Sequence, residues 1–308
     1  MADEKTAKAG MGTKALKIIG VITAVISLIL GVRQIVNMVS ENAARKSKAA
    51  ELKAEAQQLA ASGLYSKAWD TMTQAVELNS DEREAHVDLA MEWLRNARIS
   101  GTGSQPEKSF SDIVKKVSPV LHRAIDTTRR EYAATVRAHI GWAGYLLFKE
   151  GDRSVKVEEH FREALRLDSA NVYAHVMYGF WLLYPGHSGG TLEEANAHFT
   201  DAVNSGNQKQ YVRHLMLAAY QNKRQPDCQA QIIRIVNDMR LNGETMERAD
   251  RERIVADAYF LYRNEIFDEV GRILSSDEHF ATFTYLTDGV DLTARPYLKE
   301  ALARFKNP

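Results

Sequence analysis

Cysteine and proline are both scarce in this chain. Cys228 is the single cysteine among 308 residues, which excludes an intramolecular disulfide and any cysteine-rich metal site. Only six prolines occur in the same length, and long periodic stretches are rich in Ala, Leu, Glu and Arg, which favour helices. The composition therefore indicates an all-α protein.

An excess of charge of either sign is also missing. The 40 basic residues equal the 40 acidic ones, so no overall basic field favours a nucleic-acid partner. Gly101-Thr102-Gly103 is not followed by Lys-Ser or Lys-Thr, so no phosphate-binding loop is found. We therefore expect no nucleic acid and no cofactor. The length suits one large or two modest domains, although an array of repeats need not divide.

Long apolar runs are few, and the longest lies near the N-terminus. Residues Ile18 to Val32 form an uncharged run of 15, which as a helix spans roughly 22 Å of the roughly 30 Å hydrocarbon core. Extension from Leu16 to Val39 reaches the full thickness by admitting Lys17 and Arg33, whose long side chains can reach an interface. The run predicts a single-pass membrane anchor over residues 14–40, with its orientation open. A cleaved signal peptide and a buried or interfacial helix are the alternatives.

Small residues recur on one face of that predicted anchor. A small-xxx-small stripe lets two membrane helices approach closely, and it predicts self-association or pairing with another anchor. The ordinary composition of membrane helices is the alternative explanation. The helix-packing residues predicted in this way are Gly20, Thr23, Ser27 and Gly31.

Pieces of the stretch from Val157 to Leu183 recur along the chain, which makes this a repeat protein. Ala75 and Ala90 have the same separation as Ala164 and Gly179. Small residues at these steps let one helix lie close to the next, because a larger side chain would hold the backbones apart. Other equivalent residues are Ala68-Met72-Ala75, Val157-Phe161-Ala164 and Ala195-Phe199-Ala202, and the histidines of Ala85-His86, Ala138-His139 and Ala174-His175.

These residues resemble the tetratricopeptide repeat family, whose unit is a helix pair of about 34 residues. Gly63 and Tyr65 fit the first repeat well, and the resemblance covers roughly Lys46 to Gly243. It implies an α-solenoid in which the first helix of each pair lines a concave groove. Ser80 and Ser169 stand where the family commonly has Pro, and two repeats have longer loops. These departures argue against a regular superhelix but not against helix pairs.

The predicted organisation has four parts. They are a disordered tail (1–13), the transmembrane anchor (14–40), TPR-like repeats (41–243) and a C-terminal helical cap (244–308). Thr191 and Glu194 predict a capping box at one helix start. The predicted helix pairs are 46–62 with 65–78, 81–97 with 110–128, 130–150 with 155–167, 172–184 with 191–204, and 208–222 with 227–241; the cap is predicted to contain helices 246–264, 267–274 and 297–305.

The first helices of the pairs are expected to present largely apolar side chains to the groove. Co-chaperone members of the resembled family carry Lys, Asn and Arg residues that clamp a C-terminal carboxylate, and no such set is found here. An apolar groove instead suits an amphipathic helix or an extended segment of a protein partner. For the aromatic residues in general, packing between helices is the alternative role. The predicted groove residues are Met91, Leu94, Tyr173, Val176, Phe180 and Tyr184.

Two further sequence patterns resemble chemical sites, namely a nucleophile elbow and a set of metal-binding histidines. Gly186-His187-Ser188-Gly189-Gly190 matches the G-x-S-x-G nucleophile elbow, which requires a strand before the serine. Here Phe180 to Tyr184 have helical periodicity, so a loop between repeat helices is the preferred interpretation and no catalytic residue is predicted. The histidines at the repeated Ala-His position lie on different helices, and metal ligands must lie within about 2 Å of one ion. We therefore predict no metal site and assign these histidines to packing between repeats.

The sequence thus predicts a membrane-anchored, non-enzymatic scaffold or adaptor that binds a protein partner through a concave helical groove. The anchor would place that groove at a bilayer surface and raise its local concentration there. A membrane component that self-assembles through its anchor helix is the first alternative, with a homo-oligomer as its product. A serine hydrolase using Ser188 is the second.

Overall fold

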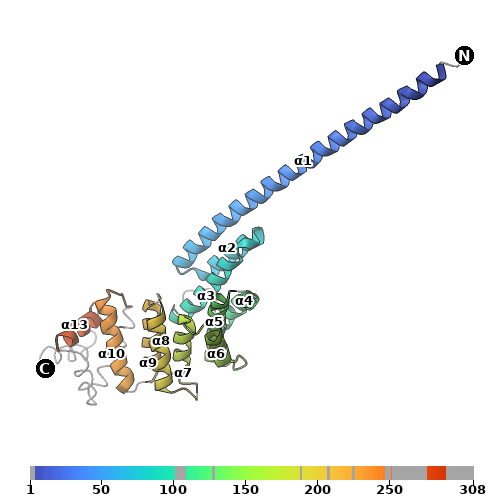
Figure 1. Cartoon of the computed structure of the whole chain (residues 1–308). Helices are drawn as coiled ribbons and strands as arrows, with labels where there is room; N and C mark the ends of the chain where they lie inside the picture. Colours follow the sequence, from blue (N-terminus) through green and yellow to red (C-terminus); the bar gives the residue numbers. More distant parts are fainter. Residues whose placement is uncertain are drawn as a thin grey trace. The chain divides into compact units, whose positions relative to one another are not determined.

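The computed structural model describes residues 4–100, 109–126, 129–187, 189–206, 209–223, 226–246, 251 and 276–288. Side chains are described from Leu28 onward, with short further gaps. The regular elements in these ranges are all helices, and no strand occurs among them (Figure 1). The predicted all-α fold is confirmed.

The chain divides into two compact units, and the boundary between them falls within helix α3 (Arg83–Ser100). The first unit comprises residues 1–93 and 102–107, and the second comprises residues 94–101 and 108–308. In the first unit, the predicted tail from Glu4, the predicted anchor and the first helix of the first repeat form one uninterrupted helix, because α1 extends from Glu4 to Ala61. This stretch contains no proline, so no residue in it removes a backbone donor from the helix.

Gly63 forms the turn that ends α1, as predicted. Its φ of 75° lies in the left-handed region that glycine adopts without a steric cost. The Gly63 N–H donates to the Ala60 carbonyl at 2.8 Å, and the Leu64 N–H donates to the Leu59 carbonyl at 2.9 Å. Helix α2 (Tyr65–Leu78) follows, and then the 3-10 helix η1 (Ser80–Glu82). Helices α1 and α2 pack together with alanines that are at most 4% exposed: Ala49, Ala56, Ala60, Ala68 and Ala75.

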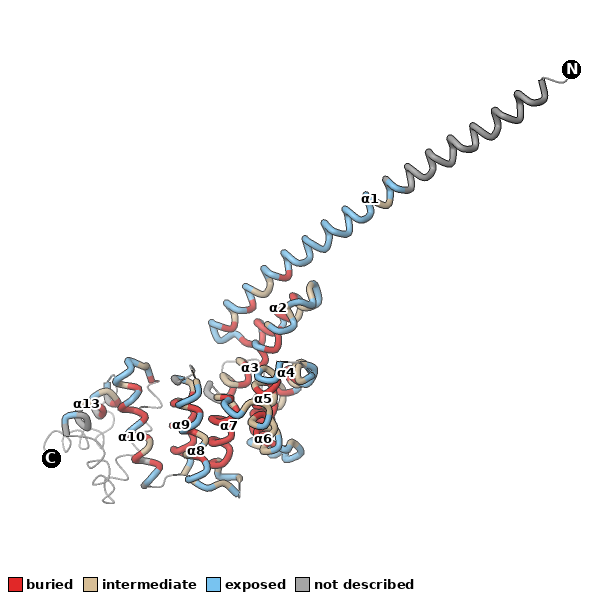
Figure 2. The backbone as a smooth tube through the Cα atoms, in the orientation of Figure 1, coloured by how far each residue is buried: buried red, intermediate tan, exposed pale blue. Residues whose placement is uncertain are grey.

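The middle of α1 differs from its end, because its apolar side chains face solvent (Figure 2). Among the described residues, no helix is both long enough and apolar enough to cross a membrane. Residues 14–27 and Ile29 of the predicted anchor lie outside the described side chains. The exposed apolar stretch consists of Leu28, Leu30, Val32, Ile35, Val36, Met38 and Val39, each 54% to 68% exposed.

The second unit is built of helices that match the predicted ranges within a few residues. Helix α5 packs on α6, α7 on α8, and α9 on α10. Helix α7 also contacts both α5 and α9, and α7 to α10 follow one another side by side (Figure 1). The helices are α4 (Phe110–Ala124), α5 (Arg130–Lys149), α6 (Val157–Leu167), α7 (Val172–Leu182), α8 (Leu192–Ser205), α9 (Lys209–Lys223), α10 (Pro226–Leu241) and α13 (Ser276–Thr287).

Aromatic side chains fill the space between α5 and α7. The ring centroids of Trp142 and Tyr145 lie 4.7 Å apart, and the Phe180 ring lies 5.3 Å from Trp142 and 5.1 Å from Tyr145. All three side chains are at most 2% exposed. Tilted and edge-on contacts at these distances are the arrangements that aromatic rings favour. These three rings therefore form core rather than a ligand box.

Small residues bring the helices of a pair together, as the repeat pattern predicts. A Cβ atom on Gly179 of α7 would lie 2.7 Å from the Phe199 ring of α8, which is too close for carbon atoms. A Cβ atom on Gly144 of α5 would lie 2.5 Å from the Val155 side chain. At both positions a larger residue would force the two segments apart.

Polar caps begin two helices of this unit. The Thr191 hydroxyl accepts from the Glu194 N–H at 3.1 Å, and the Glu194 carboxylate accepts from the Thr191 N–H at 3.2 Å. The predicted capping box at the start of α8 is therefore confirmed. Asn171 caps α7 in a similar way, because its side-chain oxygen accepts from the Ala174 N–H at 3.0 Å.

Helix α13 was not expected from the sequence. Its residues include several Thr and aromatic side chains, which favour strands more than helices. The Thr282 hydroxyl donates to the Asn237 side chain at 3.0 Å, and the Tyr285 hydroxyl donates to the Glu244 carbonyl at 2.6 Å. Packing on α10 thus stabilises a helix that local propensity does not predict. The predicted cap helices 246–264, 267–274 and 297–305 lie almost wholly outside the described residues.

Candidate functional site: an acidic groove

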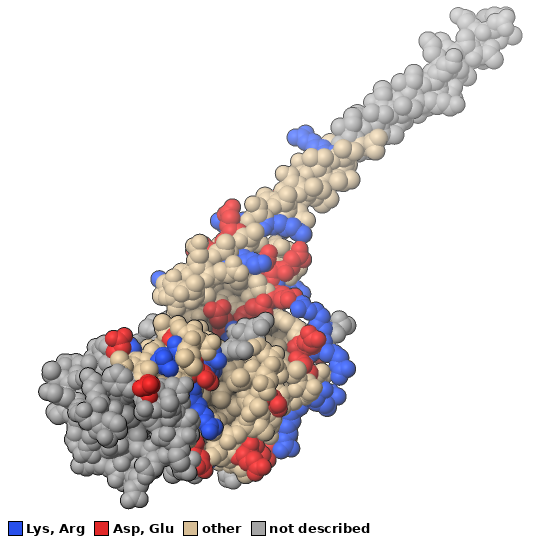
Figure 3. Space-filling view, turned by 60° about the vertical axis from the view of Figure 1, so that its left-hand side comes forward, with Lys and Arg blue, Asp and Glu red and all other residues tan. Residues whose placement is uncertain are grey.

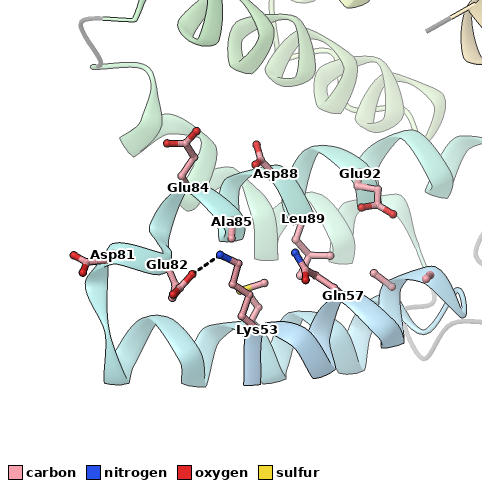
Figure 4. Close-up of a pocket in the computed structure, with 12 residues that line it drawn as sticks. Lys53, Gln57, Asp81, Glu82, Glu84, Ala85, Asp88, Leu89 and Glu92 are labelled. Atoms are coloured by element: carbon pink, nitrogen blue, oxygen red, sulfur yellow. Dashed lines mark ion pairs between the residues drawn. The ribbon is translucent and has the colours of Figure 1, made fainter. Parts of the chain in front are cut away.

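An open groove of about 590 Å³ lies in the first unit, between α1 and α3 (Figure 4). Helix α2 closes its base and η1 closes one end. Lys53 and Gln57 reach into it from α1 (Figure 4). It is lined by Lys53, Gln57, Ala60, Ala61, Met72, Asp81, Glu82, Glu84, Ala85, Asp88, Leu89 and Glu92. We call it the α1–α3 groove.

The acidic side of the groove follows from residue spacing on α3. Glu84, Asp88 and Glu92 occur at steps of four residues, which places them on one face of a helix. Glu84 and Asp88 are exposed, whereas Glu92 is half-buried. The Tyr65 hydroxyl donates to the Glu92 carboxylate at 2.9 Å, which fixes the position of this carboxylate. Glu84 and Asp88 belong to the lining of the groove, and in Figure 4 their carboxylates project from the side of α3 that faces away from Lys53 and Gln57.

The floor of the groove is apolar. Met72 of α2 is 1% exposed, and Leu89 of α3 and Ala60 of α1 are 5% and 4% exposed. Ala85 and Ala60 carry only methyl groups, so they leave the hollow above the floor open. A ligand would therefore meet buried carbon at the centre and charged oxygen at the edge.

The electrostatic balance of the groove is acidic. Its lining includes the carboxylates of Asp81, Glu82, Glu84, Asp88 and Glu92, and among the described lining residues Lys53 is the one cation. The Lys53 ammonium lies 2.9 Å from Glu82, whose side chain is 14% exposed. Asp81 pairs at 3.1 Å with Lys46, and both of these side chains are more than half exposed, so solvent screens that pair strongly. Acidic side chains, with a few basic ones, gather near the C-terminal end of α1 (Figure 3).

Most of the groove residues predicted from the sequence lie elsewhere in the structure. Met91 is 5% exposed, and Leu94, Val176 and Phe180 are fully buried. Tyr173 and Tyr184 are half-buried. Tyr184 packs on Tyr145 at 5.2 Å. These six side chains belong mainly to the contacts between helices, and none of them lines the α1–α3 groove.

Tyr173 lies in a row of side chains contributed by successive first helices. The Arg95 guanidinium lies 4.9 Å from the centroid of the Tyr173 ring, and the His139 ring lies 5.0 Å from it. Arg95 also bonds to His139 Nε2 at 2.8 Å, and His139 Nδ1 lies 2.7 Å from the Thr135 carbonyl. Since a carbonyl only accepts, Nδ1 carries the proton and Nε2 accepts from Arg95. Burial, and then the charge of Arg95, hold the pKa of His139 well below its usual value.

The repeated histidines are all buried, in agreement with their predicted role in packing. His86, His139 and His175 are at most 7% exposed. The His86 ring lies 4.1 Å from the Trp69 ring, and His175 Nε2 lies 2.8 Å from the Ser169 carbonyl. Each histidine therefore has a different partner.

Ser188 lies outside the described residues. The segment that precedes its loop is helix α7, whereas a nucleophile elbow follows a strand. Of the predicted helix-packing stripe, the side chains of Thr23 and Ser27, and Gly20, also lie outside the described part. A Cβ atom on the remaining member, Gly31, would meet no atom within 4 Å.

Sequence reasoning missed the acidic side of the groove. The signal that could have revealed it is the four-residue spacing of Glu84, Asp88 and Glu92, which periodicity alone assigns to one helix face. The groove was instead predicted on largely apolar residues in and next to α3 and α7. Apolar residues of a first helix also face its neighbours, and in this structure those contacts take Met91 and Leu94.

Comparisons with protein-family models, with curated proteins and with solved structures found no match to this chain. Its function is therefore inferred from its own residues.

Proposed function

We propose that this protein is a membrane-anchored helical-repeat adaptor that binds a basic, amphipathic segment of a protein partner in the α1–α3 groove. The observation that carries this proposal is the groove itself, with its apolar floor and the acidic residues of its lining. A helix laid into such a groove would bury its apolar stripe on Met72 and Leu89, and would place flanking Lys or Arg side chains beside the carboxylates.

The acidic charge of the groove favours a partner segment of basic charge. Five carboxylates and one lysine are among the residues that line the groove, so an acidic segment would meet mostly like charge there. Like charges placed together at an interface cost several kcal/mol. Glu84 and Asp88 are exposed, so they can attract a basic segment from solution and also contact it once bound.

The packing order of the second unit supports a tetratricopeptide-like solenoid. In such an array each helix pair contacts its neighbours, and the first helices stack on one another. Helices α5, α7 and α9 are the first helices of successive pairs, and α7 contacts both of the others. Small residues at the close approaches, such as Gly179 against Phe199, agree with the same architecture.

The proposal of a membrane anchor is supported by the apolar run from Ile18 to Val32 and by the exposed apolar stretch that continues it to Val39. Large contiguous apolar surfaces on a folded chain commonly mark contact with a membrane or another protein. A bilayer would cover the side chains on every face of α1, whereas one partner helix would cover a single face. We therefore propose a single-pass membrane location, with the repeat units outside the bilayer.

A site-specific photo-cross-linker would test the binding site. Gln57 and Gln58 are adjacent, exposed glutamines of α1, but only Gln57 lines the groove. The probe is a synthetic amphipathic peptide with a Leu stripe flanked by Lys, and its control carries Glu in place of Lys. With benzoylphenylalanine at position 57, the Lys peptide is expected to cross-link and the Glu peptide is not. At position 58 neither should cross-link.

Charge reversal provides a second, independent readout. Asp88→Lys is expected to weaken binding of the Lys peptide by about tenfold or more, whereas Glu77→Lys, an exposed acid of α2 outside the groove, should leave it unchanged. Higher salt should also weaken binding, because exposed charges are screened. Equal binding of both peptides would overturn the proposal. Cross-links between two copies of the chain would favour self-assembly instead.

A further inference from the structure

Three potential metal-binding side chains converge between α7 and α8. The Nδ1 atoms of His175 and His198 lie 3.0 Å apart, and Asp201 Oδ2 lies 3.7 Å from His175 Nδ1. One atom from each of the three residues lies within 4.8 Å of the others. Within the described part of the chain, this is the one such group of three.

The hydrogen bond of His175 Nε2 with the Ser169 carbonyl turns the other ring nitrogen, Nδ1, toward His198 and Asp201. Its Nε2 lies 2.8 Å from the Ser169 carbonyl, and a carbonyl only accepts, so Nε2 carries the proton. The Nδ1 lone pair of neutral His175 therefore faces His198 and Asp201. Histidines that bind metals commonly donate their second ring N–H to a backbone carbonyl in this way, because that bond fixes the tautomer and the ring orientation.

The two distances from His175 Nδ1 fit a divalent ion bound by nitrogen and oxygen. With metal–nitrogen bonds of about 2.0–2.1 Å, the 3.0 Å between the two Nδ1 atoms corresponds to an angle of roughly 95° at the ion. The 3.7 Å between His175 Nδ1 and Asp201 Oδ2 corresponds to roughly 125°. These angles lie on either side of the tetrahedral value. Asp201 is 58% exposed, so its carboxylate can adjust toward the ion.

We propose that His175, His198 and Asp201 form a binding site for Zn²⁺ or a similar transition-metal ion. Two imidazoles favour such ions over Mg²⁺ and Ca²⁺, which prefer oxygen ligands. Three protein ligands leave a fourth position for water, as in zinc sites that are open to solvent. The ion would link the two helices of one pair, α7 and α8, at a point where both histidines are at least half-buried.

The position of His198 on its helix supports its role as a ligand. His198 and Asp201 are three residues apart on α8, so both project from one face of that helix.

The preceding helix pair provides an internal comparison. By the repeat spacing, His139, His160 and Glu163 occupy the positions of His175, His198 and Asp201. In His139 the Nδ1 proton is donated to the Thr135 carbonyl, and Nε2 accepts from Arg95. Both ring nitrogens of His139 are therefore occupied, and the residue types alone do not create the site. The different hydrogen bond of His175 does.

A direct hydrogen bond between the two imidazoles is the competing explanation of the 3.0 Å distance. In that arrangement His198 Nδ1–H donates to His175 Nδ1, and no metal binds. The two explanations differ in what an added ion does. A metal site takes up one ion per chain, whereas the hydrogen-bonded pair takes up none.

The test uses the full chain in detergent, without a histidine tag and after chelator treatment. Zn²⁺ binding is measured by calorimetry, and the coordination by the visible absorption of added Co²⁺. We expect one Zn²⁺ per chain, tetrahedral Co²⁺ absorption, and a Zn²⁺-dependent rise in Tm. Mg²⁺ and Ca²⁺ should not compete. His198→Gln and Asp201→Asn should each weaken Zn²⁺ binding by about tenfold or more.

His160→Gln is the matched control, because His160 is half-buried at the equivalent position of α6. It should leave the Zn²⁺ affinity unchanged. Circular dichroism of each variant checks that the helices remain. Asp201 is exposed, so Asp201→Asn can be interpreted even if His198→Gln unfolds the pair. Zn²⁺ binding that survives both substitutions would overturn the proposal, as would absence of binding to the unmodified chain or Co²⁺ absorption typical of a thiolate ligand, which would identify Cys228 instead.

Discussion

Two apolar helical segments of this protein have opposite surroundings. In α7, nine of the 11 residues are buried, and the helix contacts α5, α6, α8 and α9. In the exposed stretch of α1, the described large apolar side chains between Leu28 and Val39 are more than half exposed. Both segments are apolar on nearly every face. A helix of that kind needs cover all round, and only α7 receives it from its own chain.

The difference shows that apolar composition alone does not identify a core helix. Neighbouring helix pairs surround α7, and they are supplied by the same repeated sequence. The stretch around Leu28 precedes the first pair, so the repeats provide no neighbour for it. What covers α7 is therefore protein, and we propose that lipid covers the exposed stretch of α1.

The two segments should differ most in how much stability is lost when one apolar side chain is removed from each. Phe180→Ala, in α7, is expected to lower the free energy of unfolding by about 3–5 kcal/mol, because a fully buried ring is lost and a cavity remains. Ile35→Ala, in the exposed stretch, should change it by less than about 0.5 kcal/mol. Urea unfolding followed by circular dichroism measures both changes. Similar losses would contradict the distinction drawn here.

A charge in the exposed stretch tests whether lipid covers it. Leu28→Lys is expected to disfavour membrane insertion by about 2.5–3.5 kcal/mol if position 28 lies near the bilayer centre, and the chain should shift from vesicles to the soluble fraction. Leu78→Lys, at an exposed leucine that ends α2, is the matched control and should leave the partition unchanged. Flotation with phospholipid vesicles measures it. Flotation of the Leu28→Lys chain equal to that of the unmodified chain would exclude this stretch as the anchor.

Two glycines sharpen the comparison further. A Cβ atom on Gly179 of α7 would lie 2.7 Å from the Phe199 ring, so Gly179→Ala should destabilise the second unit by about 1–3 kcal/mol. A Cβ atom on Gly31 of α1 would meet no atom within 4 Å. Gly31→Ala should instead favour the helix by about 0.5–1 kcal/mol. Thermal unfolding and helix content distinguish these opposite signs, and a stabilised Gly179→Ala chain would show that the close approach is absent.

The packed unit should also respond to pH, because it buries histidines. The pKa of His139 is lowered by burial and by Arg95. Below the unfolded pKa of about 6.5, the unfolded chain therefore binds a proton that the folded chain does not. Stability should fall as the pH drops from about 6.5 toward the folded pKa, by at most about 1.4 kcal/mol per pH unit for this histidine.

His139→Gln should reduce that slope, although the substitution itself also costs stability through the lost hydrogen bonds. His160 and His198 have lowered pKa values as well, so part of the slope should remain. His122→Gln, at an exposed histidine of α4, is the control. Urea unfolding in chelator between pH 5 and pH 7.5 provides the measurement, and an unchanged slope in His139→Gln would contradict the assignment.

Much of the fold could be predicted from periodicity and turn chemistry. Gly63 ends α1 and the Thr191–Glu194 box begins α8 as predicted, because these signals act within one turn of helix. Helix α13 could not be predicted, since Thr282 and Tyr285 stabilise it through contacts with residues about 40 positions away. The α1–α3 groove was not predicted, because none of the six residues expected to line a groove lies in it. Its acidic residues were not identified.

The helical fold, the ends of most helices and the small residues that allow close approach can all be predicted from the sequence. These properties depend on neighbours three or four residues away, which the sequence displays directly. Which side of each helix remains open depends instead on how the helices pack. Packing buries Leu94 and Phe180, leaves Asp88 exposed in the lining of a groove, and directs His175 toward His198 while His139 faces Arg95. Adjacent residues on a helix point about 100° apart, so these outcomes depend on small rotations that are fixed only when helices pack together.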